Sequence, residues 1–149
     1  MRLHPAMQTV DRQVVTLRPA TLSTRIVGVV SQHANGYARS YAAGKVIATD
    51  TAHTFADGLA VRVPDPEALA VIGRGAARIV TVGEAEIRRA MRILYSDTHN
   101  LAEGAGAAAL AAALQERRRL ANKRVAVIQS GGNIDRDLFA QVLAEEDPA

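Results

Sequence analysis

The chain has 149 residues, which is enough for one domain with a buried core. It is 48% hydrophobic but only 3% aromatic, and it has no cysteine, which excludes disulfides, thiolate metal sites and cysteine nucleophiles and fits a reducing cytoplasm. The net charge is +3, yet the arginines are dispersed among acidic residues and are not interleaved with aromatics, so we expect no nucleic-acid partner. No apolar run approaches the roughly 18 residues that a membrane span needs, so we expect no membrane partner.

The first half of the chain alternates strand and helix signals after an irregular start. Residues 1–24 contain prolines and show no clear hydrophobic period, so we expect them to be irregular, ahead of one α/β domain over 25–149. Gly44 stands where a helix C-cap would, and Asp65 followed by Pro66 is typical of a helix start. The expected elements are a strand at 25–30, a helix at 34–43, a loop at 45–58 with an extended piece at 46–47, an extended segment at 59–63, a helix at 67–72 and a strand at 78–82.

The second half continues this alternation. Glu84 and Glu86 stand where they favour the dipole of a helix start. The apolar positions after them recur at helical spacing and predict one buried face: Ile87, Ala90, Met91 and Leu94. The remaining expected elements are a helix at 103–114 with a basic, exposed end at 116–119, a buried strand at 125–129 and a final helix at 135–144. Together they predict a three-layer α/β fold, a mostly parallel sheet with helices on both faces.

The expected strand at 125–129 ends abruptly in Ser130, Gly131, Gly132 and Asn133. In open α/β sheets, ligands bind just outside the carboxyl ends of strands. Two glycines there let the backbone turn tightly and approach a ligand without a Cβ in the way. The pattern therefore predicts Ser130 at a ligand site, and the alternative is a plain helix start capped by Asn133.

A second motif has Glu103 before a helix that carries Gly104 and Gly106 in its first turn. Glycine costs about 1 kcal/mol inside a helix, so two of them indicate that the helix start lies close to something flat. The helix dipole favours the Glu103 carboxylate at that end. The alternative is a tightly packed core helix in which Glu103 is only an N-terminal charge.

A third motif spans 54–58 and ends in an Asp-Gly pair, which by itself is typical of a turn. Other chemistry-bearing residues give weaker patterns. His33, His53 and His99 lack the spacing of a metal site, so we expect structural roles for them, with His99 near a helix C-terminus. Ser130 lacks the G-x-S-x-G context of a hydrolase nucleophile.

The three motifs occur in order, at 54–58, 97–107 and 130–135. As an ordered set they resemble the C-terminal half of the fold-type II pyridoxal-phosphate enzymes, specifically the threonine/serine dehydratases, over 25–145. The resemblance implies a partial fold-type II domain, pyridoxal 5'-phosphate as the cofactor and an amino acid as the substrate. The implied reaction is β-elimination of water from L-threonine or L-serine, which gives a 2-oxo acid and ammonia.

The resemblance also implies roles for residues of this chain. The hydroxyl of Ser130 would bond the pyridine nitrogen of the cofactor, with Gly131 beside it. Glu103 and the backbone from Gly104 onward would lie beside the ring. The main chain at Gly58 would line the cofactor pocket.

The chain departs from the family where catalysis is concerned. The family's Schiff-base lysine lies in the N-terminal half, and neither Lys45 nor Lys123 stands in its place, so we assign no catalytic residue. The family's glycine-rich phosphate loop should precede the first strand, but residues 1–24 contain no glycine. We therefore expect a truncated chain that alone neither binds the cofactor nor deaminates threonine. The positions where some members carry carboxylates for a divalent cation are Val30 and Gly36 here, so we expect no metal.

A chain that holds half of a sheet is expected to expose apolar edges and helix faces, so we expect a cytoplasmic protein that self-associates, most simply as a symmetric dimer. Two alternatives to the enzyme stay open. One is a noncatalytic remnant of the fold that associates with a partner. The other is a module that binds a small anion at the loop over 130–133.

Overall fold

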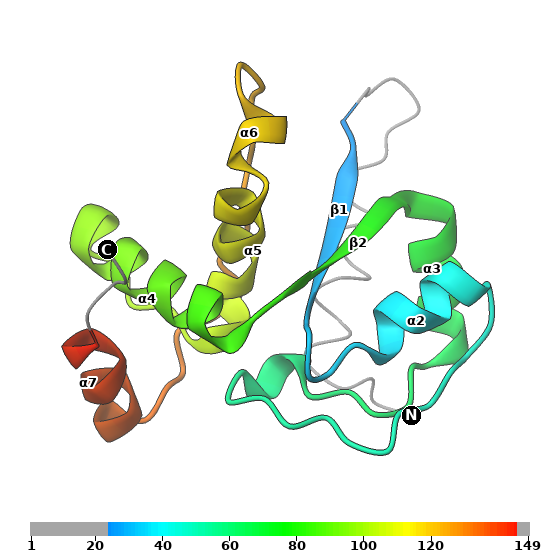
Figure 1. Ribbon diagram of the computed structural model, residues 1–149, viewed down its shortest axis with the longest axis horizontal. Coiled ribbons are helices and arrows are strands. Elements are labelled where there is room, and N and C mark those ends of the chain that lie inside the picture. The colour runs from blue at the N-terminus through cyan, green and yellow to red at the C-terminus, as the bar shows by residue number, and fades with distance from the viewer. Residues whose placement is uncertain (1–23, 146–149) are drawn as a thin grey trace.

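The computed structural model describes residues 24–145 (Figure 1). Residues 1–23 of the segment expected to be irregular, and residues 146–149, lie outside the described residues. The elements in chain order are β1 (Ile26–Ser31), α2 (Gly36–Ala43), the 3₁₀ turn η1 (Asp57–Leu59), α3 (Pro66–Gly75), β2 (Ala76–Val82), α4 (Glu84–Thr98), α5 (Gly104–Gln115), α6 (Arg117–Leu120) and α7 (Arg136–Ala144).

The sheet of the described chain consists of β1 and β2, paired in parallel. Val27 pairs with Arg78 and Ser31 with Val82, and the Gln32 N–H continues the ladder to the Val82 carbonyl at 2.9 Å. Both strands are rich in β-branched residues, which suit the pleated, half-buried surface of a sheet. The predicted parallel pairing is confirmed, and it brings the carboxyl ends of both strands to one edge.

Helices cover both faces of this sheet, so the predicted layering is confirmed (Figure 1). On one face α2 and α3 pack over a small apolar cluster: Val30, Tyr37, Ala68, Leu69 and Ile72. On the other face α5 contacts both strands, and α4 packs against α5. The larger cluster lies there and includes Val82, Ile87, Met91, Ala107 and Val142. Its side chains are mostly small, which lets α4 and α5 approach closely.

Local capping chemistry sets the helix ends that we expected. Gly44 ends α2 in the left-handed conformation, with φ of 66°. The Asp65 carboxylate accepts from the backbone N–H groups of Glu67 and Ala68 at 2.9 and 3.0 Å, which caps α3. His99, with φ of 55°, is the left-handed C-cap of α4, as its position after the apolar period suggested. Each of these ends depends on residues next to one another in sequence.

The predicted buried strand at 125–129 is wrong. These residues form neither a strand nor a helix, and Val125, Val127 and Ile128 are 49%, 41% and 40% exposed. A strand needs a neighbour to satisfy its backbone groups, and β1 and β2 pair with each other rather than with this run. Within residues 24–145, no further strand is available to bury it.

One smaller expectation also fails. The segment at 59–63, expected to be extended, contains the end of η1 and no strand, because the N–H groups of Leu59 and Ala60 donate to the carbonyls of Ala56 and Asp57 and close turns. Residues 46–47 lie in a loop as expected, where both backbone groups of Ile47 bond to the Ser40 hydroxyl. The basic end after α5 is exposed as expected but forms the short helix α6.

Candidate functional site

Three segments predicted for the site meet at the N-terminus of α5. They are the loop at 54–58, the segment at Glu103 and the glycine turn that follows Ser130. The Glu103 N–H donates to the Gly131 carbonyl at 3.1 Å, and the Glu103 carboxylate accepts from the Asn133 N–H at 3.1 Å. The Gln129 side chain donates to the Leu101 carbonyl at 2.9 Å. Segments almost thirty residues apart in sequence therefore lie side by side, and Glu103 is the residue that joins them.

The glycines of this cluster permit close approach between parts of the chain. A Cβ on Gly106 would collide with the Gly131 carbonyl oxygen. A Cβ on Gly131 would lie 2.5 Å from Oε1 of Glu103, and one on Gly132 would lie 2.6 Å from the Leu101 carbonyl oxygen. The Cβ positions of the glycine pair after Ser130 thus face Glu103 and Leu101, so these glycines permit packing within the chain.

Gly104 likewise permits a close approach, here between the start of α5 and the loop at 54–58. A Cβ on Gly104 would lie 2.8 Å from Cε2 of Phe55 and 2.9 Å from Cβ of Ala56, which is 1% exposed. The flat object beside the helix start is thus the Phe55–Ala56 segment. This supports the packing interpretation for the two glycines of α5, while the bond to Asn133 makes Glu103 more than an N-terminal charge.

Ser130 and Gly58 lie at the margins of this cluster. Ser130 is exposed, and within residues 24–145 its hydroxyl has no hydrogen-bond partner. Gly58 is half-buried and lines an apolar cavity of about 50 Å³ on the α2–α3 face of the sheet, together with Gly28, Tyr37 and Ile72. Five residues were predicted for the site. Glu103, Gly104 and Gly131 adjoin one another, whereas Gly58 and Ser130 are connected to them only through neighbouring residues of the chain.

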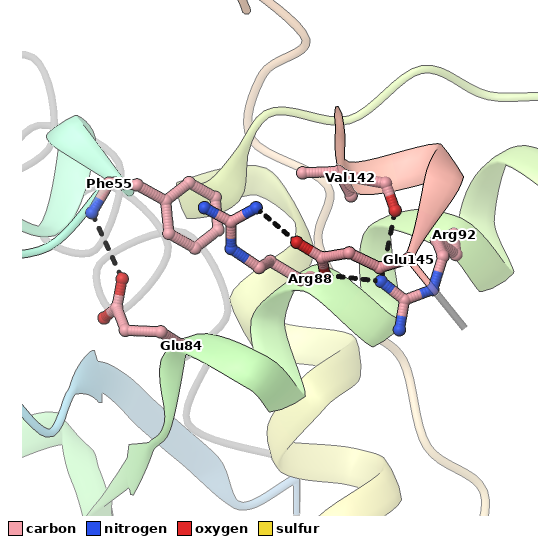
Figure 2. A network of polar contacts seen from close by, with 6 residues as sticks. All are labelled: Phe55, Glu84, Arg88, Arg92, Val142 and Glu145. Carbon is pink, nitrogen blue, oxygen red and sulfur yellow. Dashed lines mark hydrogen bonds and ion pairs between the residues drawn. The ribbon is translucent and has the colours of Figure 1, made fainter. Parts of the chain in front are cut away.

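Glu84 also belongs to this region, although its position in the sequence predicted only a favourable helix start. Its carboxylate accepts from the Thr54 hydroxyl at 2.9 and 3.1 Å, from the Phe55 N–H at 3.1 Å and from the Ser31 hydroxyl at 2.7 Å (Figure 2 shows the bond to Phe55). The only signal in the sequence was an acidic residue two positions after the carboxyl end of a strand. Such a residue also favours the helix dipole, so the pattern could not separate the two roles.

The cluster contains no lysine among the described residues. Lys45 and Lys123, the lysines of the sequence, are both exposed and outside it. Among residues 24–145, no three His, Asp or Glu side chains gather to hold a metal ion. None of the helices in that range combines the length and the hydrophobicity that a membrane-spanning helix requires. Gly36 packs against the Val61 carbonyl oxygen, 3.3 Å from where its Cβ would be, which leaves little room for a carboxylate.

The far end of α5 carries an ion pair that fastens it to the sheet. Arg78, in β2, donates from its guanidinium to the carboxylate of Glu116, which caps the C-terminus of α5. The guanidinium of Arg119 contacts the same carboxylate at 3.1 Å. The hydrogen bond from Arg78 holds the pKa of Glu116 below its usual value, with smaller contributions from the charges of Arg78 and Arg119. The helix that begins at the candidate site is therefore anchored at its opposite end.

Known proteins of one family are similar to this chain over most of its length. A family model described as pyridoxal-phosphate dependent enzyme matches residues 13–131. The catabolic L-threonine dehydratase TdcB of Escherichia coli is 33% identical over 130 residues, which are 86% of this chain and 40% of the relative. The beta-hydroxyaspartate dehydratase of Paracoccus denitrificans is 34% identical over 123 residues, 83% of this chain and 39% of the relative.

Solved structures give the same result. The processed form of threonine deaminase isoform 2 from Solanum lycopersicum superposes with a TM-score of 0.82 at 27% identity, covering 91% of this chain and 38% of that one. The chain spans about two fifths of the length of the two curated relatives named above. Since the family match covers most of the sequence, the chain belongs to the family of pyridoxal-phosphate dependent enzymes.

Proposed function

We propose that this chain carries the ring-nitrogen side of the cofactor site of a threonine or serine dehydratase. The observation that supports it best is the junction of Glu103 with the glycine turn, which leaves the Ser130 hydroxyl exposed and unpaired within residues 24–145. A hydroxyl fixed beside a helix N-terminus suits a ring nitrogen, which accepts one hydrogen bond. The residues present therefore fit one side of a pyridoxal phosphate site.

In this proposal each residue has a separate task. Ser130 donates to the pyridine nitrogen, and Gly131 keeps the chain close to Glu103 so that the hydroxyl is held in place. Glu103 and the first turn of α5 from Gly104 lie beside the ring, and the main chain near Gly58 lines the pocket. Bound pyridoxal phosphate would supply the electron-withdrawing ring that stabilises charge developing at the substrate Cα.

A neutral hydroxyl at the ring nitrogen favours elimination over competing reactions. Ser130 cannot stabilise a positive charge on the ring as a carboxylate would, because it offers no charge pairing. Charge at Cα is then stabilised less, which suits a reaction in which it leaves promptly with the departing β-hydroxyl. Transamination requires that charge to persist until a proton is returned elsewhere. The proposed reaction is therefore the dehydration of L-threonine or L-serine to a 2-oxo acid and ammonia.

We further propose that the lysine and the phosphate-binding loop of the site come from a segment that precedes this half in the longer relatives. Lys45 and Lys123 are exposed and are not part of the cluster, so neither is suited to bind the cofactor covalently. The described chain alone is then expected neither to bind pyridoxal phosphate tightly nor to deaminate threonine.

The assembly that we propose is a symmetric dimer in the cytoplasm. The support is the exposed apolar run at 125–128 together with Leu101, which is 42% exposed. Adjacent apolar side chains on a surface are typical of a contact with another protein surface. The absence of cysteine from the sequence fits a reducing compartment.

A chimera tests the proposal. Residues 25–145 would replace the matching residues of the E. coli threonine dehydratase, and binding of pyridoxal phosphate and production of 2-oxobutanoate from L-threonine would be measured. We expect both, and we expect Ser130→Ala to weaken cofactor binding about fivefold to tenfold through one lost hydrogen bond. Ser130→Asp is expected to divert flux towards transamination. A folded chimera in which Ser130→Asp eliminates as fast and as cleanly as the parent would rule out Ser130 as the ring-nitrogen partner.

A further inference from the structure

Glu84, the first residue of α4, joins the end of the sheet to the loop at 54–58. It accepts hydrogen bonds from Ser31 at the end of β1 and from both Thr54 and Phe55 in the loop. Ser31 is fully buried. A carboxylate only accepts, and all three partners donate, so the group is matched to this position.

The two hydroxyls that reach Glu84 also have fixed orientations. The Ser31 hydroxyl oxygen accepts from the His33 N–H at 3.1 Å, and the Thr54 hydroxyl oxygen accepts from the Ala56 N–H at 3.1 Å. Each hydroxyl therefore donates to Glu84 while it accepts from a backbone group two residues further on. Such a network determines the backbone path of the loop through Ala56.

Arg88 contacts the same loop from the next turn of α4. Its guanidinium carbon lies 4.5 Å from the centre of the Phe55 ring, and it pairs with Glu145 at 2.8 Å (Figure 2). Phe55 is thereby held by its backbone at Glu84 and by its ring at Arg88. Phe55 and Ala56 also lie against Gly104, which is next to Glu103.

We propose that Glu84 is a positioning residue for the candidate cofactor site. It sets the loop at 54–58 against Gly104 and so determines where the N-terminus of α5, with Glu103, stands. What the site binds rests on the function proposed above, but the positioning itself is a property of this chain and is measurable without a cofactor.

Amide hydrogen exchange of the full chain, followed by NMR, tests this role. Glu84→Gln keeps the shape of the side chain but presents an NH₂ group to partners that donate. The N–H groups of Phe55, Ala56 and Leu59 donate to the Glu84 carboxylate, the Thr54 hydroxyl and the Ala56 carbonyl, respectively. Exchange of these three amides is expected to accelerate about tenfold or more. The amides of Glu103 and Asn133, which Glu84 does not touch, are expected to accelerate about threefold, and a purely local structural role would leave them unchanged.

The matched control is Glu86→Gln. Glu86 lies in the same first turn and accepts from the Gly83 N–H at 2.7 Å, but it has no bond to the loop. This variant is expected to leave exchange at 55–59 and at Asn133 unchanged. A second variant, Thr54→Val, removes the bond from the loop side and is expected to repeat the Glu84→Gln pattern.

Uniform acceleration across all helices in both Glu84→Gln and Thr54→Val, or no change at Asn133 in either, would overturn the positioning role. If Glu84→Gln fails to fold, Thr54→Val decides the question by the same pattern. An inactive chimera together with the expected exchange pattern would reject the proposed function and leave the positioning role standing.

Discussion

The two segments that flank the start of α5 are held in different ways. The loop at 54–58 is fastened by side chains from α4, with Glu84 at its backbone and Arg88 over Phe55. The run at 125–133 is held by bonds at its far end, to Leu101 and Glu103, and leaves its apolar side chains exposed. The loop at 54–58 is thus ordered by side chains of α4, the helix that follows the two paired strands. The run at 125–133 has no strand partner among residues 24–145 and is fastened only where it touches the helix start.

Closing the gap at the helix start is expected to have the largest effect. Gly106→Ala puts a Cβ against the Gly131 carbonyl, and both groups are backbone-bound, so neither moves without shifting a segment. We expect a loss of about 1–3 kcal/mol in the free energy of unfolding, measured by urea denaturation. Gly73→Ala is the matched control, because a Cβ there meets nothing within 4 Å, and it is expected to stabilise the protein by about 0.5–1 kcal/mol. Equal effects of the two substitutions would contradict the close approach.

Removing the Glu103 carboxylate isolates the bond that fastens the 125–133 run. Glu103→Ala is expected to cost about 1.5 kcal/mol, because the Asn133 N–H loses a charged acceptor, and to accelerate exchange of that amide. Glu67→Ala removes an exposed carboxylate from the first turn of α3, and the Glu67 side chain has no hydrogen bond or ion pair among residues 24–145. Its cost is expected to be smaller, a few tenths of a kcal/mol from the helix dipole. The comparison fails if the two costs agree.

The ion pair at the other end of α5 gives a pH test. Because the pKa of Glu116 is lowered in the folded state, its stabilisation is present above the ordinary glutamate pKa and is lost as the pH falls through the lower folded value. Arg78→Met is expected to cost about 1 kcal/mol at pH 7, since both side chains are partly exposed, and the difference from the parent is expected to shrink in acid. Arg117→Met, on the exposed helix α6, serves as control. A difference that stays constant from pH 7 to acid would exclude this pair as its source.

The exposed run itself is expected to affect association more than stability. Val127→Asp is expected to change the free energy of unfolding by less than about 0.5 kcal/mol, because the side chain is already exposed. It is also expected to convert a dimer to a monomer in light scattering at micromolar concentration. Val63→Asp, at a side chain that is 61% exposed elsewhere, is expected to leave the dimer intact. A parent chain that is monomeric would reject the proposed assembly.

Local chemistry made much of the fold predictable from the sequence. The ends of α2, α3 and α4 follow from Gly44, Asp65 and His99, whose conformations or bonds involve only adjacent residues. The apolar period after Glu84 predicted the buried face of α4, and the β-branched runs predicted both paired strands. The motif order also predicted the family, because residues that share a site keep their order along the chain even when their contacts are unknown.

Only the tertiary structure decided what depends on a distant partner. The run at 125–129 has the composition of a buried strand, but a strand exists only where another backbone pairs with it, and composition does not supply that backbone. The glycines at 104 and 106 signalled a close approach without saying to what, because a missing Cβ leaves space for any neighbour. The role of Glu84 could not be predicted either, because a carboxylate at a helix start is favourable whether or not it also binds Thr54, thirty residues away in sequence.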